Sequence, residues 1–184
     1  LNKKYLNKVI SIGTMHEHYK NNLYNHFNLY TERKKAYYDI VLFFKLKYPK
    51  IKFYNLKFYE TFSYNDNRQK IIPTLIKNYK KDKITTLSSS KLSLNFIHVY
   101  DLISGLNLLL KKKINSGEYL IKSSNFTNIK ILIDSLNNRL KKKIKFKIKE
   151  NKFEKINFNL KKLPNWKQTI KIENFLKEYF YEKN

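Results

Sequence analysis

The sequence predicts an α/β fold, because short apolar strand segments alternate with helical segments along the chain. Residues 9–14 are a short β-branched run that ends in Gly-Thr, which is typical of a buried parallel strand. Residues 29–46 carry apolar side chains at helical spacing, and Pro49 ends that predicted helix. Residues 51–58 alternate apolar and polar side chains, which predicts a second strand.

The rest of the chain continues this alternation. We predict strands at 83–89, 95–100 and 117–122, and helices at 70–79, 101–110, 128–136 and 171–180. Asp101 and Thr127 each precede a helical pattern, so we expect both side chains to cap helices by accepting hydrogen bonds from first-turn amides. Residues 144–150 alternate lysine with apolar side chains, which indicates an edge strand protected by its charges.

Composition limits the class of protein. The 184 residues suffice for a compact core, and no run approaches the roughly 18 apolar residues that a membrane helix needs. The first residues lack the apolar segment of a secretory signal, and without cysteine there is neither a disulfide nor a thiolate metal site. His16 and His18 have no third ligand placed by spacing, so we predict no metal. We expect a cytoplasmic protein.

The formal net charge of +25 suggests a nucleic-acid-binding protein as an alternative. However, only Arg33, Arg68 and Arg139 are arginines, and the other basic residues are lysines. Lys, Asn, Ile, Tyr and Phe all have A/T-rich codons, so a base-composition bias accounts for their abundance. Specific readers of nucleic acid usually rely on arginine. We therefore favour solvated lysines, and keep a basic nucleic-acid- or polyanion-binding protein, or an inactive remnant, as alternatives.

A Tyr-x-x-x-Lys pair, Tyr30 and Lys34, stands at the start of the predicted helix 29–46, and Thr14 ends the strand before it. A spacing of four residues puts both side chains on one helix face. An ammonium close to a phenol favours the phenolate and lowers the phenol's pKa, which makes tyrosine a usable acid or base near neutral pH. Because α/β sheets bind ligands at the carboxyl ends of their strands, Thr14 is placed to hold a substrate hydroxyl.

These segments resemble the NAD-dependent epimerase/dehydratase family, extended short-chain dehydrogenases that act on nucleotide sugars. The resemblance is carried by IGTMHEHY and by LYTERKKA, which contain Thr14, Tyr30 and Lys34. Four further blocks agree in order and spacing: LKFYETFSYNDNRQKIIPTLIK, LNFIHVYDLISGLNLLL, GEYLIKSSNFTNIKILID and LPNWKQTIKIENFLK. The resemblance therefore covers nearly the whole chain.

The resemblance implies the C-terminal part of a Rossmann-type parallel sheet in residues 1–60 and a small substrate-binding region in 61–184. It also implies NAD or NADP as cofactor, a nucleotide sugar as substrate, and a homodimer formed through the helix that carries Tyr-x-x-x-Lys and the helix next to it. The family's glycine-rich dinucleotide turn is not among these residues, whose glycines stand at 13, 105 and 117. We therefore expect the dinucleotide-binding segment to be missing here and the isolated chain to have poor activity.

The family pattern implies a role for each matching residue. Tyr30 is the acid/base at the sugar hydroxyl, and exchanges its proton as hydride moves to or from nicotinamide. Lys34, together with Tyr30, binds the cofactor at the nicotinamide ribose, while Thr14 hydrogen-bonds the reacting sugar hydroxyl. Arg68 is a candidate for binding the nucleotide diphosphate, with a solvated loop arginine as the alternative. Relatives commonly carry Ser or Thr where Met15 stands, so the hydroxyl role rests on Thr14.

Overall fold

The structure, a computed structural model, describes residues 6–18, 28–150 and 160–182. The chain forms two compact units, each assembled from separate stretches. Unit 1 is built within Leu1–Tyr59, Leu102–Lys122 and Ile156–Lys167, and unit 2 within Glu60–Asp101, Ser123–Lys155 and Gln168–Asn184. Strands and helices alternate, and three of the four sheets among the described residues are parallel throughout, so the predicted α/β class is confirmed. The assignment of 1–60 and 61–184 to separate roles stays a prediction.

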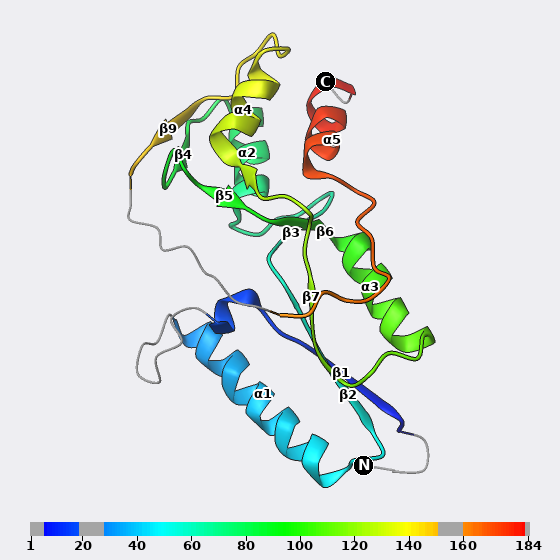
Figure 1. The fold of residues 1–184 in the computed structure, drawn as a ribbon. Coiled ribbons are helices and arrows are strands. Elements are labelled where there is room, and N and C mark those ends of the chain that lie inside the picture. The colour runs from blue at the N-terminus through cyan, green and yellow to red at the C-terminus, as the bar shows by residue number, and fades with distance from the viewer. Residues whose placement is uncertain (1–5, 19–27, 151–159, 183–184) are drawn as a thin grey trace. The chain divides into compact units, whose positions relative to one another are not determined.

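Unit 1 is organised around a parallel sheet of three strands. Its order is β1 (Lys8–Ile12), β2 (Lys52–Phe58) and β7 (Gly117–Ile121), with β2 in the centre (Figure 1). Pairing places Ser11 opposite Asn55 in one ladder, and Asn55 opposite Glu118 in the other. Because side chains alternate between the two faces of a sheet, these three polar residues share one face.

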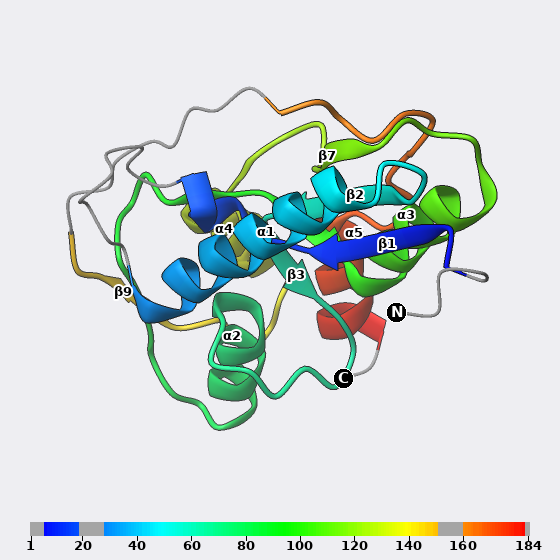
Figure 2. The same ribbon diagram turned by 90° about the horizontal axis from the view of Figure 1, so that it is seen from below.

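Helix α1 (Leu29–Lys47) lies along that face of the sheet, as Figure 2 shows. Asn28 caps its start, since the Asn28 side chain accepts a hydrogen bond from the Thr31 amide at 2.9 Å. Val41 of α1 packs against Phe53 of β2 in a small apolar cluster. Residues 102–111 of α3 (Val99–Lys111) cover the other face, where a Cβ on Gly105 would lie 2.2 Å from the Ile121 side chain. Only glycine allows this approach.

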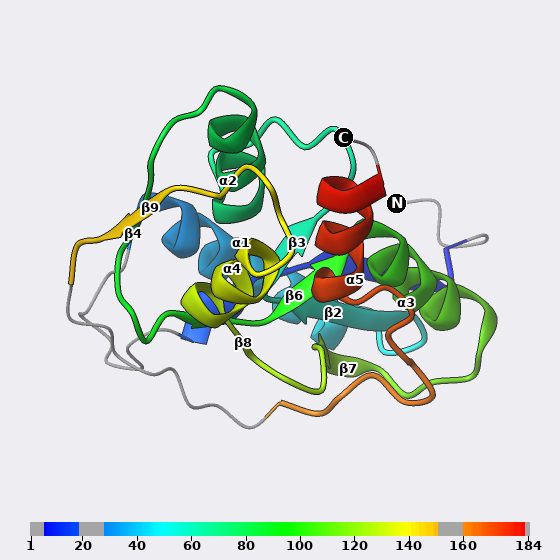
Figure 3. The same cartoon turned by 90° about the horizontal axis from the view of Figure 1, so that it is seen from above.

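Unit 2 combines three short sheets with helices. Its strand pairs are β3 (Glu60–Phe62) with β6 (Phe96–His98), β4 (Thr85–Leu87) with β9 (Phe146–Ile148), and β5 (Ser93–Leu94) with β8 (Thr127–Asn128). Figure 3 shows its helices, α2 (Ile71–Lys80), α4 (Ile129–Asn137) and α5 (Ile172–Lys177), beside the β3–β6 pair. The helices η1 (Met15–His18, in unit 1) and η2 (Glu178–Glu182, in unit 2) complete the described elements. Within the described ranges, no helix is both long enough and apolar enough to cross a bilayer.

Two of the predicted helix caps are wrong. Helix α3 begins at Val99, directly after a strand, so Asp101 lies inside its first turn. The Asp101 carboxylate accepts hydrogen bonds from the Thr169 amide at 2.9 Å and the Ile170 amide at 3.0 Å, and thus holds a distant loop. In α4 the cap is Asn128, which accepts from the Ile131 amide, whereas Thr127 donates to Glu173 at 2.9 Å. Asp101 and Thr127, which have the sequence context of helix caps, therefore make tertiary contacts instead.

A buried histidine stands in the unit 2 core. His98 is 1% exposed, and its ring lies 5.1 Å from Phe62, 5.0 Å from Tyr100 and 5.9 Å from Phe175 between ring centroids. Its Nδ1 accepts a hydrogen bond from the Tyr100 amide, while its buried Nε2 has no hydrogen-bond partner among the described residues. Burial lowers the pKa of His98, and the nearby Asp101 only partly opposes that shift.

We expect the free energy of unfolding to decrease as the pH falls, because of His98. Because its pKa is lower in the folded than in the unfolded state, its contribution is complete above the unfolded value of about 6.5 and is lost as pH falls through the folded value. Urea unfolding at a series of pH values from about 7 to 5 should show this decline, and His98→Phe should flatten it. An unchanged slope in His98→Phe would show that other groups cause the decline.

Candidate functional site

The site begins where β1 ends. The Gly13 amide donates to the Leu56 carbonyl at 3.0 Å, which continues the ladder by one residue, and Thr14 then begins the turn into η1. Thr14 is buried, and its hydroxyl accepts a hydrogen bond from the His16 amide at 3.4 Å. The Glu17 carboxylate accepts from the Thr14 amide at 2.6 Å. This reciprocal pattern is a capping box, and it fixes the backbone at Thr14.

Tyr30 and Lys34 lie in the first turns of α1, as the sequence predicts. The Tyr30 side chain is 57% exposed, so its hydroxyl is accessible to a ligand. The Lys34 ammonium lies 5.9 Å from the centre of the Tyr30 ring and donates to the Ile12 carbonyl at 2.9 Å. Lys34 therefore connects the start of α1 to the last residue of β1, two residues before Thr14.

This arrangement provides three kinds of group at the carboxyl end of one strand. Tyr30 offers a phenol that can give or take a proton, Lys34 an ammonium, and Thr14 a hydroxyl. Met15 is 1% exposed and belongs to the core. The roles implied by the resemblance for Tyr30, Lys34 and Thr14 stay predictions.

Arg68 lies in unit 2, in the loop after β3. Its guanidinium donates to the Asp66 carboxylate at 2.9 and 2.6 Å, and to the Thr61 hydroxyl at 3.0 Å. The Arg68 guanidinium holds the pKa of the Asp66 carboxyl below its usual range. Arg68 therefore fastens its own loop in this structure, and its contact with a nucleotide diphosphate stays a prediction.

Sequence reasoning missed a buried charged cluster beneath α1. The Lys57 ammonium lies 3.0 Å from Glu17 and 2.9 Å from Glu118, and its side chain is only 2% exposed. It also lies 5.0 Å from the centre of the Tyr38 ring. Burial, followed by a hydrogen bond to Glu118, raises the pKa of Tyr38. The missed signal was that central parallel strands are covered on both faces, so a lysine within β2 must find buried partners.

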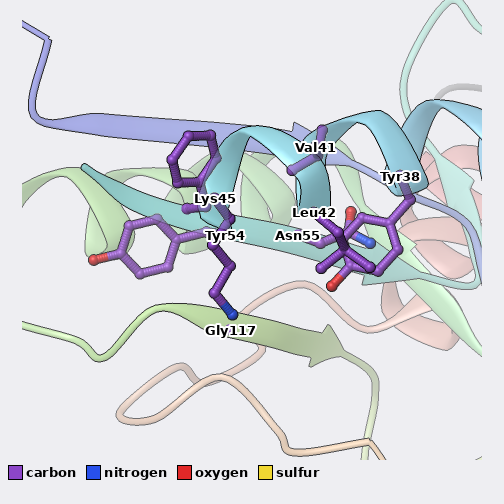
Figure 4. Close-up of a pocket in the computed structure, with 8 residues that line it drawn as sticks. Tyr38, Val41, Leu42, Lys45, Tyr54, Asn55 and Gly117 are labelled. Carbon is purple, nitrogen blue, oxygen red and sulfur yellow. The ribbon is translucent and has the colours of Figure 1, made fainter. Parts of the chain in front are cut away.

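A small recess opens beside this cluster between α1 and the sheet, and Figure 4 shows the side chains around it. It is lined by Tyr38, Val41, Leu42, Lys45, Phe53, Tyr54, Asn55 and Gly117. The space accommodates about one water molecule, which is far too little for a sugar or a nucleotide. The recess is a packing defect next to the site.

Comparison with known proteins identifies the family of this chain. Residues 8–121 match the NAD dependent epimerase/dehydratase family. CDP-abequose synthase of Salmonella muenchen is 25% identical over 96 residues, which are 52% of this chain and 33% of that protein. The chain thus spans about a third of this relative.

Solved structures share the fold at low sequence identity. The dTDP-glucose 4,6-dehydratase of Bacillus anthracis, in complex with NAD, has a TM-score of 0.72 and 20% identity, over 96% of this chain and 62% of that chain. The UDP-glucuronic acid 4-epimerase of Bacillus cereus, in complex with UDP-glucuronic acid and NAD, has a TM-score of 0.73 and 17% identity over the same shares. The family match covers well over half of the 184 residues. The chain belongs to the NAD dependent epimerase/dehydratase family.

Proposed function

We propose that the protein containing this chain acts on nucleotide sugars by nicotinamide-dependent oxidation and reduction, as an epimerase, dehydratase or reductase. The observation that supports the proposal is the hydrogen bond from Lys34, one turn after Tyr30 on α1, to the Ile12 carbonyl at the end of β1, two residues before Thr14. Family membership supports NAD as cofactor, with NADP as the alternative. The named relatives all act on nucleotide-linked sugars, which supports that substrate class. The cytoplasmic location expected from the sequence stays a prediction.

The residues present fit the nicotinamide end of such a cofactor. The Lys34 ammonium has three donors, and the Ile12 carbonyl takes one of them, so Lys34 can also donate to ribose hydroxyls. The nicotinamide, when bound, supplies the acceptor or donor of hydride. The pyrophosphate would need a glycine-rich turn at a helix N-terminus, and the three glycines of this sequence do not form that motif.

The proton steps belong to the chain's own side chains. When the sugar carbinol is oxidised, its hydroxyl proton passes to the Tyr30 oxygen, and reduction returns the proton by the same path. The Thr14 hydroxyl orients the reacting sugar hydroxyl from the end of β1, where its own backbone is fixed by Glu17.

We also propose a homodimer formed through α1. One side of this helix exposes large apolar side chains instead of burying them in unit 1: Leu29 (66%), Tyr37 (49%), Ile40 (55%), Phe43 (59%) and Leu46 (83%). Tyr37, Ile40 and Phe43 follow one another at three-residue spacing and so neighbour each other on the helix surface. An apolar patch of this kind is typical of a protein interface, and a second copy of α1 would cover it.

Tyr30→Phe should lower turnover of the accepted nucleotide sugar by roughly 10²–10⁴-fold, because it removes the transferable proton and keeps the ring. The measurement is steady-state turnover by the full-length protein with a panel of nucleotide sugars and NAD or NADP. Substrate affinity should change little, since the ring remains.

Tyr100→Phe is the matched control, because Tyr100 is also exposed but lies outside the proposed site. It should leave turnover unchanged. Full activity of Tyr30→Phe on any substrate would show that Tyr30 is not the acid/base.

Phe43→Glu should separate the dimer into monomers, because it places a charge in the centre of the apolar side of α1. Light scattering after size-exclusion chromatography measures the mass directly. Lys52→Glu, which changes charge at an exposed position of β2, is the control and should remain dimeric. A wild-type protein that is monomeric at micromolar concentration would refute the dimer.

A further inference from the structure

We propose that Lys57 is a positioning residue for Thr14 and acts through Glu17. The inference rests on the proposed function, because it gives the Thr14 hydroxyl its role at the reacting sugar hydroxyl. It assigns a task to a buried ion pair that the proton chemistry of Tyr30 does not use.

One carboxylate links the lysine to the threonine. Glu17 lies 3.0 Å from the Lys57 ammonium through Oε2, and accepts from the Thr14 amide at 2.6 Å through Oε1. The Lys57 and Glu17 side chains are 2% and 3% exposed, so water competes little for either contact. The position of the Thr14 backbone thus depends directly on where Lys57 holds the carboxylate.

The physical cost of removing the cation supports this link. A buried carboxylate that loses its partner must take up a proton or move toward water, because an uncompensated charge in the interior is strongly unfavourable. Either response weakens the charge-assisted hydrogen bond from Glu17 to the Thr14 amide. The capping box would then loosen, and the Thr14 hydroxyl would lose its fixed direction.

Close packing limits the alternatives for Glu17. A Cβ on Gly13 would lie 2.8 Å from Glu17 Oε1, 2.9 Å from Lys57 Cγ and 3.0 Å from Asn55 Oδ1. The pair therefore packs directly against the backbone that leads into Thr14, and only glycine leaves enough room. Ser11 completes this layer by donating to Asn55 Oδ1 at 3.0 Å. The Glu17 carboxylate is thus held by the Lys57 ammonium and by the Thr14 amide within a closely packed layer.

The other end of the cluster anchors Lys57 to the catalytic helix. The Lys57 ammonium contacts Glu118 of β7 at 2.9 Å, and Glu118 is hydrogen-bonded to Tyr38 of α1. Tyr38 follows Lys34 by four residues and Tyr30 by eight, so the three share one side of α1. Lys57 thus lies between the loop that carries Thr14 and the helix that carries Tyr30.

A lysine that only stabilises the fold would predict a different pattern of effects. Its loss would lower activity regardless of what stands at position 14. A positioning role through Thr14 instead predicts that the effects of the two substitutions are coupled. Once Thr14 is truncated to alanine, no hydroxyl remains for Lys57 to position, so replacing Lys57 should have little further effect on kcat.

The test is a double-mutant cycle in the full-length protein. Lys57→Met should lower kcat for the nucleotide sugar by about tenfold or more, with KM changed less, since small misplacements at a reaction centre are costly. In the Thr14→Ala background the same change should lower kcat less than about twofold. Lys52→Met, on the same strand but exposed, is the matched control and should have no effect.

Two Glu17 variants keep the test decisive if Lys57→Met does not fold. Glu17→Ala leaves Lys57 paired with Glu118 but removes the carboxylate that links Lys57 to Thr14, so it should reproduce the loss in kcat. Glu17→Gln keeps an acceptor for the Thr14 amide and should retain more activity than Glu17→Ala. Equal losses for the two Glu17 variants, or an undiminished Lys57→Met effect in Thr14→Ala, would overturn the inference.

Hydrogen exchange of the Thr14 amide gives a readout that does not depend on turnover. The amide should be protected in the wild-type protein and in Lys52→Met, and should exchange about tenfold faster or more in Glu17→Ala. Full protection in Glu17→Ala or Lys57→Met would overturn the inference while leaving the proposed function intact. Absence of wild-type turnover on every nucleotide sugar would overturn the proposed function instead.

Discussion

Lys57 and its two carboxylates form a buried ion-pair cluster that joins η1, β2 and β7 of unit 1. Lys57 and Glu17 are almost completely buried, and burial of a charged group costs several kcal/mol that only close pairing can offset. The pairing depends on strand register, because Glu118 of β7 stands opposite Asn55 of β2, and Glu17 lies in η1, the short helix that follows β1. A slip by one residue would move Lys57 to the opposite face of β2, away from both carboxylates. The charged cluster and the parallel sheet therefore specify each other.

The same cluster lies where four elements of the chain meet at the candidate site. Gly13 and Thr14 come from the end of β1, Lys57 from β2 and Glu118 from β7, while Lys34 binds the Ile12 carbonyl from α1. No single one of these elements could fix the position of the Thr14 hydroxyl relative to the Tyr30 phenol. A site of this kind is rigid because its supporting groups are buried and mutually paired.

The sequence allowed prediction of the elements whose signals are local. Helix α1 is periodic and followed by Pro49, and the strands of unit 1 have short β-branched, alternating or apolar patterns, so the predicted and observed elements agree closely. The Tyr30–Lys34 pair was also found because its spacing is local. The caps at Asp101 and Thr127 were wrong because a side chain that can cap a helix can equally bind a distant amide or carboxylate. Lys57, Glu17 and Glu118 were missed because only strand pairing brings them together.

Lys57 is distinguished from the surface lysines of this chain by its burial. A bias toward lysine fills the surface with cations whose positions carry little meaning, and 39 basic residues face only 14 acidic ones. Carboxylates are therefore scarce, yet two of them meet one buried lysine beside Thr14, where an apolar side chain would pack at no electrostatic cost. Compositional drift adds charge where water can solvate it, and does not explain an ion pair inside a sheet. Under the proposed positioning role, the buried ion pair at the end of β1 serves to hold Thr14.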